Sequence, residues 1–156
     1  KAHIGVDAES GLVHTVIGTP GNVNDVVPAN SLLHGEESTV FADSGYRGAQ
    51  KRPDAKAGVT WQIAVRPSDR RRLKAGAALG AILDQIEKLK ASIRAKVEHP
   101  FRVIKRQFGY TKVRYRGLFK NTVQLKTLFA LSNLWMARAK LMALDGQVRP
   151  LGAKLV

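Results

Sequence analysis

The stretch Arg94–Lys105, RAKVEHPFRVIK, holds the pattern from which the fold of this chain is most directly predicted. Apolar residues recur in and around it at spacings of three and four, the period of an amphipathic helix. They are Ile82, Ile86, Leu89, Ile93, Val97, Phe101, Ile104 and Phe108. At about 100° per residue, Arg94, Glu98 and Lys105 lie within roughly 40° of one another, beside this stripe. The sequence therefore predicts a long helical region, from about 78 to 108, with a carboxylate between two cations at the edge of its buried face.

Pro100 interrupts this helical pattern, because proline lacks a backbone N–H and disfavours helical geometry at the residue before it. Either the helix kinks at Pro100, or a second helix starts there with Pro100 in its first turn. Both structures place Glu98 beside a break, where a side chain can point into a cleft. Glu98 is the only acidic residue between Lys90 and Lys120. Two interpretations are open: Glu98 is a functional group, or it pairs with neighbouring arginines at i,i+4 spacing.

The charge of the chain is strongly positive and unevenly distributed. The 156 residues suffice for one core and one domain, and their formal net charge is +14. Residues 1–45 hold one Lys and six acidic residues, net −5, whereas residues 46–156 hold 25 Lys or Arg and six acidic residues, net +19. A basic surface of this size is typical of nucleic-acid binding, where neutralised phosphates supply most of the affinity. The acidic first part is suited to holding cations instead.

Several other classes of protein are disfavoured by composition. The chain has no cysteine, which excludes disulfides and thiolate metal sites and suits a reducing cytoplasm. No apolar run approaches the roughly 18 residues that span a bilayer. The first residues, KAHIGVDAESG, lack the apolar core of a signal peptide. We therefore expect a cytoplasmic protein that does not enter a membrane.

The first half of the chain predicts an α/β fold. Two short β-branched runs, Ala2–Asp7 and Leu12–Ile17, predict a hairpin whose turn contains Gly11. Asn24 is a suitable cap for a short helix to about Leu33. Two further runs predict buried strands, the first of them central, and a basic loop follows. These segments are Ser38–Ala42, Trp61–Val65 and Arg70–Lys74.

The second half, beyond the long helical region, predicts a basic segment and a last helix. Arg114, Arg116 and Lys120, with Tyr110 and Tyr115, form the mixture of cations and aromatic rings that contacts nucleic acids, although the tyrosines can equally pack in the core. The segment Thr111–Tyr115 alternates as an extended strand does. A largely buried helix is expected from an Asn121 cap to about Leu144, and Asp145-Gly146 should end it.

Asp43 is the second candidate functional residue. It follows the predicted strand Ser38–Ala42 and precedes Gly45. The carboxyl ends of buried strands form the rim at which α/β sheets bind ligands. Alternatively, Asp43 caps the next turn through its own backbone.

The order of these elements, together with four sequence blocks, resembles a known family. The blocks are KAHIGVDAESGLVH, GNVNDV, FADSGYRGA and KASIRAKVEHPFRVIKRQFGYTKVRYRGLFKN. They resemble bacterial insertion-sequence DDE transposases of the "four-like" group, and most closely its "insertion sequence five" branch, from Lys1 to about Ala137. The resemblance implies an α/β fold in which an RNase H-like mixed sheet is flanked by helices, with the first strand missing and long C-terminal helices. Residues 1–144 would form this partial catalytic domain and 145–156 a flexible tail.

The family signature (Tyr, two residues, Arg, three, Glu, six, Lys) matches this chain at three of its four positions. Arg94, Glu98 and Lys105 match, while Ala91 stands where the tyrosine would be. The resemblance implies that Asp43 is the second catalytic carboxylate and Glu98 the third. Both would be metal ligands, and the DNA-binding residues would be Arg94, Arg102, Lys105, Arg106, Arg114 and Arg116. The family's first catalytic Asp lies on a strand before KAHIGVD, and Asp7, which falls in the second-strand block, is expected to be structural.

The implied reaction is DNA strand cleavage and transfer. Such in-line displacement uses two divalent cations about 3.5–4 Å apart, and Mg²⁺ (or Mn²⁺) prefers hard carboxylate oxygens. We expect Asp43 and Glu98 to share this site, and we expect the chain alone to bind DNA with little or no strand transfer. The implied partners are transposon-end and target DNA, with a possible homodimer in a bacterial, nucleoid-associated complex. Two alternatives remain, a non-catalytic DNA-binding remnant and a basic RNA-binding protein.

Overall fold

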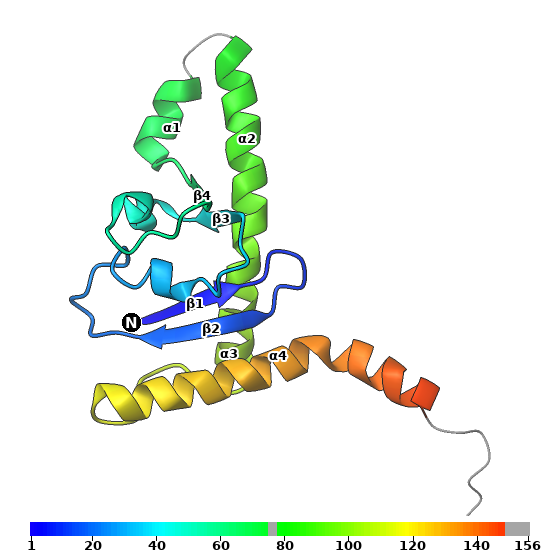
Figure 1. The fold of residues 1–156 in the computed structure, drawn as a ribbon. Coiled ribbons are helices and arrows are strands. Elements are labelled where there is room, and N and C mark those ends of the chain that lie inside the picture. Colours follow the sequence, from blue (N-terminus) through cyan, green and yellow to red (C-terminus); the bar gives the residue numbers. More distant parts are fainter. Residues whose placement is uncertain (75–77, 149–156) are drawn as a thin grey trace, which may run out of the picture.

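The computed structural model describes residues 1–74 and 78–148. Short 3-10 helices, labelled η, stand between the strands and longer helices. The elements in chain order are β1 (Ala2–Val6), β2 (Val13–Gly18), η1 (Asn30–Leu32), β3 (Thr39–Ala42), η2 (Ser44–Tyr46), η3 (Ala49–Lys51), β4 (Thr60–Ile63), α1 (Pro67–Lys74), α2 (Ala78–Arg94), η4 (Ala95–Val97), α3 (Glu98–Arg106) and α4 (Leu118–Val148). In Figure 1, α2 and α3 form one long column beside the strands, and α4 crosses below β2.

The predicted N-terminal hairpin is confirmed. β1 and β2 pair antiparallel, from Ala2 opposite Gly18 to Val6 opposite Val13, with an irregularity in the register after Gly5. Gly11 supplies the turn with a φ of 74°, a backbone conformation that favours glycine. This hairpin is one of two two-stranded sheets in the described residues.

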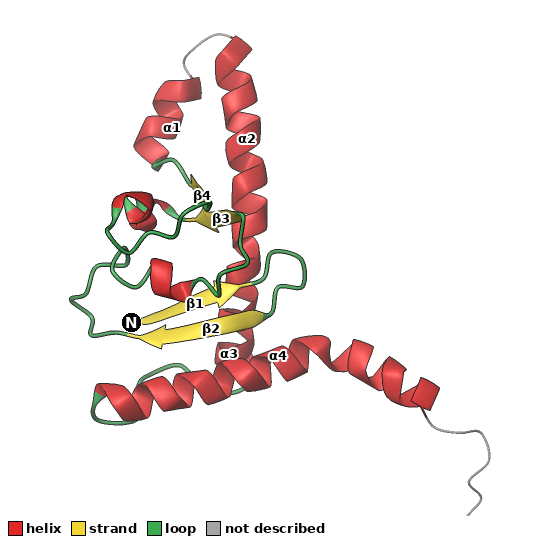
Figure 2. Ribbon diagram, in the orientation of Figure 1, coloured by secondary structure: helices red, strands yellow, loops and turns green. Residues whose placement is uncertain are grey.

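The two later strands are also confirmed, but they form a separate sheet. β3 and β4 pair in parallel, Thr39 opposite Thr60 and Ala42 opposite Ile63. Figure 2 shows the two yellow strand pairs lying apart. The expected single mixed sheet is therefore seen as two two-stranded sheets. The prediction that both strands are buried is wrong: the apolar residues of β3 and β4 are only half-buried. The prediction that β3 is central is also wrong, because within the described residues it pairs with β4 alone.

The break in the long helical region follows the second of the two predicted structures. α2 tightens into η4, and α3 then begins at Glu98 with Pro100 in its first turn. Pro100 is fully buried, so its ring packs in the interior at a position where its missing N–H costs no helical hydrogen bond. Lys96, in η4, fixes this junction to the hairpin, because its Nζ donates to the carbonyl oxygens of Ala8 and Glu9.

The hydrophobic core lies where the hairpin, α3 and α4 meet. Its buried members are Ile4, Val13, Ile104, Leu125 and Phe129. Phe101 of α3 packs edge-on against Phe129 of α4, with ring centroids 5.2 Å apart. This packing holds the first turn of α3, and with it Glu98, against the rest of the fold.

The last helix is longer and more exposed than predicted. α4 begins at Leu118, three residues before the expected cap, and Asn121 instead donates from within the helix to the carbonyls of Tyr115 and Gly117. Only one face is covered, by β2 and α3, so Phe119 is 81% exposed and the prediction of a largely buried helix is wrong. α4 also continues through Asp145-Gly146 to Val148, so the expected end is wrong, and the rest of the predicted tail, 149–156, lies outside the described residues.

Three other local predictions are corrected. The basic segment Arg70–Lys74 lies in helix α1 rather than a loop, because Pro67 starts the helix and Arg70 pairs with Asp84 at 2.8 Å. The predicted helix after Asn24 is a series of turns that ends in η1. The segment Thr111–Tyr115 is an irregular loop, because it has no neighbouring strand to pair with. No described helix has the length and apolar composition needed to cross a bilayer.

Candidate active site

A groove lies between the two sheets, and two of the predicted site residues, Asp43 and Arg94, line it. Its volume is about 530 Å³. β1 lines one wall and β3 the other, and the junction of α2 with η4 contributes Arg94 and Lys96. Asp43 lines the groove at the carboxyl end of β3. Each wall is a strand that pairs, within the described residues, along one edge only.

Asp43 makes the capping contact that was one of the two alternatives, and it also lines the groove. It caps η2, because its Oδ1 accepts a hydrogen bond of 2.8 Å from the backbone N–H of Gly45. It also faces the groove, and its side chain is half-buried rather than enclosed. Among the described residues, its second carboxylate oxygen accepts no hydrogen bond. The cap therefore orients Asp43 while leaving one oxygen for a ligand.

Glu98 does not line the groove, but it forms an ion pair with Arg94, which does. The Arg94 Nη1 and Glu98 Oε1 atoms lie 3.8 Å apart, so the i,i+4 ion pair is present. Arg94 lines the groove together with Asp43, whereas Glu98 is not among the lining residues and its side chain is 65% exposed. So exposed a pair contributes little stability, and water can replace it readily. Arg94 thus lines the same groove as Asp43 and pairs with Glu98, which lies outside the groove lining.

The other predicted DNA-binding cations lie on the solvent-exposed surface. Arg102, Lys105 and Arg106 project from α3, and Arg114 and Arg116 lie in the loop that leads to α4. None of the five forms an ion pair with another residue in the described parts of the chain. Their charges are therefore exposed beside the junction that carries Glu98.

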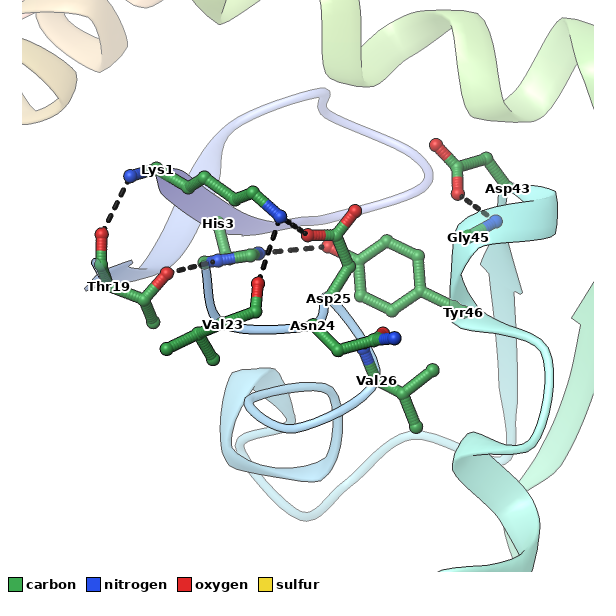
Figure 3. A network of polar contacts seen from close by, with 10 residues as sticks. All are labelled: Lys1, His3, Thr19, Val23, Asn24, Asp25, Val26, Asp43, Gly45 and Tyr46. Atoms are coloured by element: carbon green, nitrogen blue, oxygen red, sulfur yellow. Dashed lines mark hydrogen bonds and ion pairs between the residues drawn. The ribbon is translucent and has the colours of Figure 1, made fainter. Parts of the chain in front are cut away.

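A second carboxylate near Asp43, that of Asp25, was not predicted as a site residue. A Cβ placed on Gly45 would lie 2.9 Å from Asp43 Oδ1 and 3.4 Å from Asp25 Oδ2, so the two acids flank the same backbone position. Figure 3 shows Asp25 next to the ring of Tyr46, with Asp43 close by. Asp25 Oδ1 also pairs with Lys1 Nζ at 3.0 Å. Asp25 belongs to the GNVNDV block, and its place in that block is the sequence signal that could have identified it.

Tyr46 and His3 lie next to Asp25 and Asp43. Burial, together with the negative charges of Asp25 and Asp43, raises the pKa of Tyr46 to about 12. His3 is buried, with its Nδ1 3.4 Å from the Tyr46 hydroxyl and its Nε2 2.8 Å from Thr19 Oγ1. Burial lowers the pKa of His3, which keeps the ring neutral. A line of polar contacts therefore joins β1 to the short helix that Asp43 caps (Figure 3).

Asp7 has the contacts of the structural residue that was expected. Its Oδ1 accepts from the Ser10 hydroxyl at 2.5 Å and from the Ser10 N–H at 2.6 Å, which closes the hairpin turn. The hydrogen bond from the Ser10 side chain, followed by that from its backbone, lowers the pKa of Asp7. Asp7 is therefore held as a carboxylate at the turn, although it too borders the groove.

Comparison with known protein families gives a match over most of the chain. The model of the transposase DDE domain matches residues 1–134, which is most of the chain. The chain therefore belongs to the transposase DDE domain family. Members of this family are transposases, which act on DNA and generally use divalent metal ions. No solved structure matches this chain significantly.

Proposed function

We propose that this chain is part of the catalytic domain of an insertion-sequence transposase of the "four-like" group, in the "insertion sequence five" branch. Its reaction would be metal-dependent cleavage and transfer of DNA strands. The family match supports the reaction class. The Arg94, Glu98 and Lys105 spacing, which runs from the last residue of α2 into α3, supports the group, and the four sequence blocks support the branch.

The groove between the sheets is the observation that carries this proposal. β1 and β3 each present one edge that is unpaired within the described residues, and both edges line the groove. A strand placed there would pair with both edges and join the two sheets into one RNase H-like mixed sheet. The family's first catalytic strand would take this place, and its Asp would complete the set of carboxylates that includes Asp43.

The two candidate carboxylates have the chemistry that suits a magnesium-type ion. Asp43 offers a carboxylate oxygen to the groove, and Glu98, paired only weakly, has a second carboxylate at the adjoining helix start. These are the hard oxygen donors that Mg²⁺ or Mn²⁺ prefers. When bound, such ions activate the attacking oxygen and stabilise the leaving oxygen of a phosphodiester.

The remaining residues would hold DNA and keep the carboxylates in position. Arg94 can exchange its exposed contact with Glu98 for a phosphate oxygen, to which guanidinium groups bind with two parallel hydrogen bonds. Arg102, Lys105, Arg106, Arg114 and Arg116 would extend the phosphate-binding surface beyond the groove. Lys96 donates a hydrogen bond to the hairpin turn at Ala8, so it would hold β1 and η4 together rather than bind DNA.

The proposed partners are transposon-end and target DNA, in a homodimer associated with the bacterial nucleoid. A dimer is supported by apolar side chains exposed on α2 and α4, among them Leu79, Leu89, Leu134 and Met142. Side chains of this kind, when clustered on a surface, are typical of protein interfaces.

The missing first carboxylate gives the proposal a direct test. The chain as it stands, and the product of the same reading frame extended upstream of Lys1, are incubated with supercoiled plasmid and Mg²⁺. We expect both to bind DNA, and only the extended protein to nick it. Asp43→Asn and Glu98→Gln should each abolish nicking by the extended protein without weakening its DNA binding.

Two results would contradict parts of the proposal. Nicking by the present chain that disappears in Glu98→Gln would show that no further carboxylate is needed. An extended protein that binds DNA but never nicks it would favour the alternative function, a non-catalytic DNA-binding remnant.

A further inference from the structure

Three metal-ligand side chains gather at the end of the groove that lies away from Asp43. His14 comes from β2, and His34 and Glu37 come from the loop between η1 and β3. One ligand atom from each lies within 4.8 Å of the others. No other group of three such residues is present in the described parts of the chain. Glu37 precedes β3 and Asp43 follows it, so at about 3.3 Å per residue the two acids are up to roughly 20 Å apart.

The carboxylate of this cluster is held in place by its own loop. Glu37 Oε1 accepts a hydrogen bond of 2.7 Å from the N–H of His34, and Oε2 accepts one of 2.8 Å from the N–H of Gly35. Gly35 has a φ of 114°, which permits this tight turn and favours glycine. The Glu37 side chain is only 14% exposed. Its oxygens are therefore oriented toward His34, whose Nε2 lies 3.5 Å from Oε1.

His14 is fixed from the opposite side of the groove. Its Nδ1 is hydrogen-bonded to the Thr15 hydroxyl at 2.9 Å, which leaves Nε2 as the second nitrogen of the ring. The ring packs edge-on against that of His34, with centroids 4.7 Å apart. Gly5 leaves the space for it, since a Cβ there would lie 2.4 Å from His14 Cε1. An outer hydrogen bond of this kind is what orients histidines that bind metals.

We propose that His14, His34 and Glu37 form a binding site for a zinc-type transition-metal ion. Zinc binds such atoms at about 2.0–2.2 Å, which brings tetrahedral ligands to about 3.3 Å from one another. His34 has room for the necessary movement, because its side chain is 45% exposed. Imidazole ligands favour zinc, copper or nickel, whereas an all-carboxylate site favours magnesium. The site is therefore distinct in place and in chemistry from the one proposed at Asp43.

The bound ion would join the two sides of the groove. His14 belongs to the hairpin, and His34 and Glu37 belong to the loop that leads into β3. Three protein ligands leave one position for water or another ligand. Because binding requires the folded arrangement, the ion would stabilise the folded chain.

Zinc binding to the full chain tests this site independently of DNA cleavage. Calorimetric titration with Zn²⁺ should show one site per chain, and Co²⁺ at the same site should give the visible absorption of a tetrahedral complex. His14→Ala and Glu37→Gln should weaken binding at least about tenfold, and Thr15→Val by a smaller factor. His99→Ala, an exposed histidine outside the cluster, and Asp43→Asn should leave the affinity unchanged.

The imidazole NMR signals of His14 and His34 provide a readout that needs no substitution, because both should shift when Zn²⁺ is added. Absence of stoichiometric Zn²⁺ binding by the unmodified chain would overturn the proposal. So would zinc affinity that is equal in His14→Ala, Glu37→Gln and the unmodified chain. Loss of binding in His99→Ala or Asp43→Asn instead would place the ion elsewhere.

Discussion

At the scale of single residues, two acids near the carboxyl end of β3 lie on either side of one glycine. Asp25 and Asp43 flank Gly45, and both act on Tyr46. Like charges this close repel one another unless a cation or a hydrogen-bond donor compensates. Lys1 compensates Asp25 and the N–H of Gly45 compensates Asp43. The pKa of Tyr46 is therefore sensitive to the charges of Asp25 and Asp43, and a cation bound to these acids would lower it.

The titration of Tyr46 makes this residue-scale prediction measurable. In an ultraviolet absorbance titration of the three tyrosines, one should ionise near pH 12, and Tyr46→Phe should remove that step. Asp25→Asn should lower the pKa of Tyr46 toward its usual 10.0, because one repelling charge is lost. A titration that is unchanged in Asp25→Asn would show that the two groups do not interact.

The same shift makes the free energy of unfolding depend on pH. The pKa of Tyr46 is raised in the folded state, so its contribution to stability is complete below about pH 10 and is lost as pH rises toward about 12. Urea unfolding at pH 9 and at pH 11 should therefore show a loss of stability that is smaller in Tyr46→Phe.

At the scale of elements, the hairpin and α4 are in unusually close contact. Asn133 of α4 pairs with the backbone of Val13, donating to its carbonyl at 2.7 Å and accepting from its N–H at 2.9 Å. At the other end of β2, a Cβ on Gly18 would lie 2.1 Å from Thr122 Oγ1. Glycine at this position lets the strand and the helix approach each other.

Gly18→Ala should therefore separate β2 from α4. We expect a loss of about 1–3 kcal/mol in the free energy of unfolding, the usual cost of overpacking, measured by urea denaturation. Gly21→Ala is the matched control, because a Cβ there meets nothing within 4 Å and its effect should stay within about 0.5 kcal/mol. Equal effects of the two substitutions would contradict the close approach of β2 and α4.

At the scale of the whole molecule, charge is distributed in a way that suits DNA. The acidic residues 1–45 supply much of the lining of the pockets that contain Asp25, Asp43 and Glu37. The basic residues 46–156 include α3 and the loop before α4. Phosphate contacts release counterions, so affinity falls as salt rises, with a slope set by the number of contacts. The proposed surface therefore predicts which cations change that slope.

Substitutions on α3 test this prediction. In fluorescence-anisotropy titrations with duplex DNA, Arg102→Ala and Lys105→Ala should each lower the slope of log affinity against log salt by about one. Lys51→Ala, an exposed cation on η3, should leave the slope unchanged. A change at Lys51 equal to that at Lys105 would show that DNA does not bind specifically along α3.

The sequence by itself determined the local structure and the family. Short β-branched and apolar runs predicted the hairpin and both later strands, and the helical period near Glu98 together with Pro100 predicted a break in the long helical region. These features depend on interactions between residues close together in the chain, so the pattern of the sequence predicts them. The motif spacing gave the family for the same reason.

Only the tertiary structure decided which faces are covered and which distant residues meet. The apolar pattern of α4 predicted burial, yet only β2 and α3 are present to cover it, so one face stays exposed. The approach of Asp25 to Asp43, and that of His14 to Glu37, depends on how the loops around β3 fold back on the hairpin. Such contacts join residues far apart in the chain, and no local period encodes the path that brings them together.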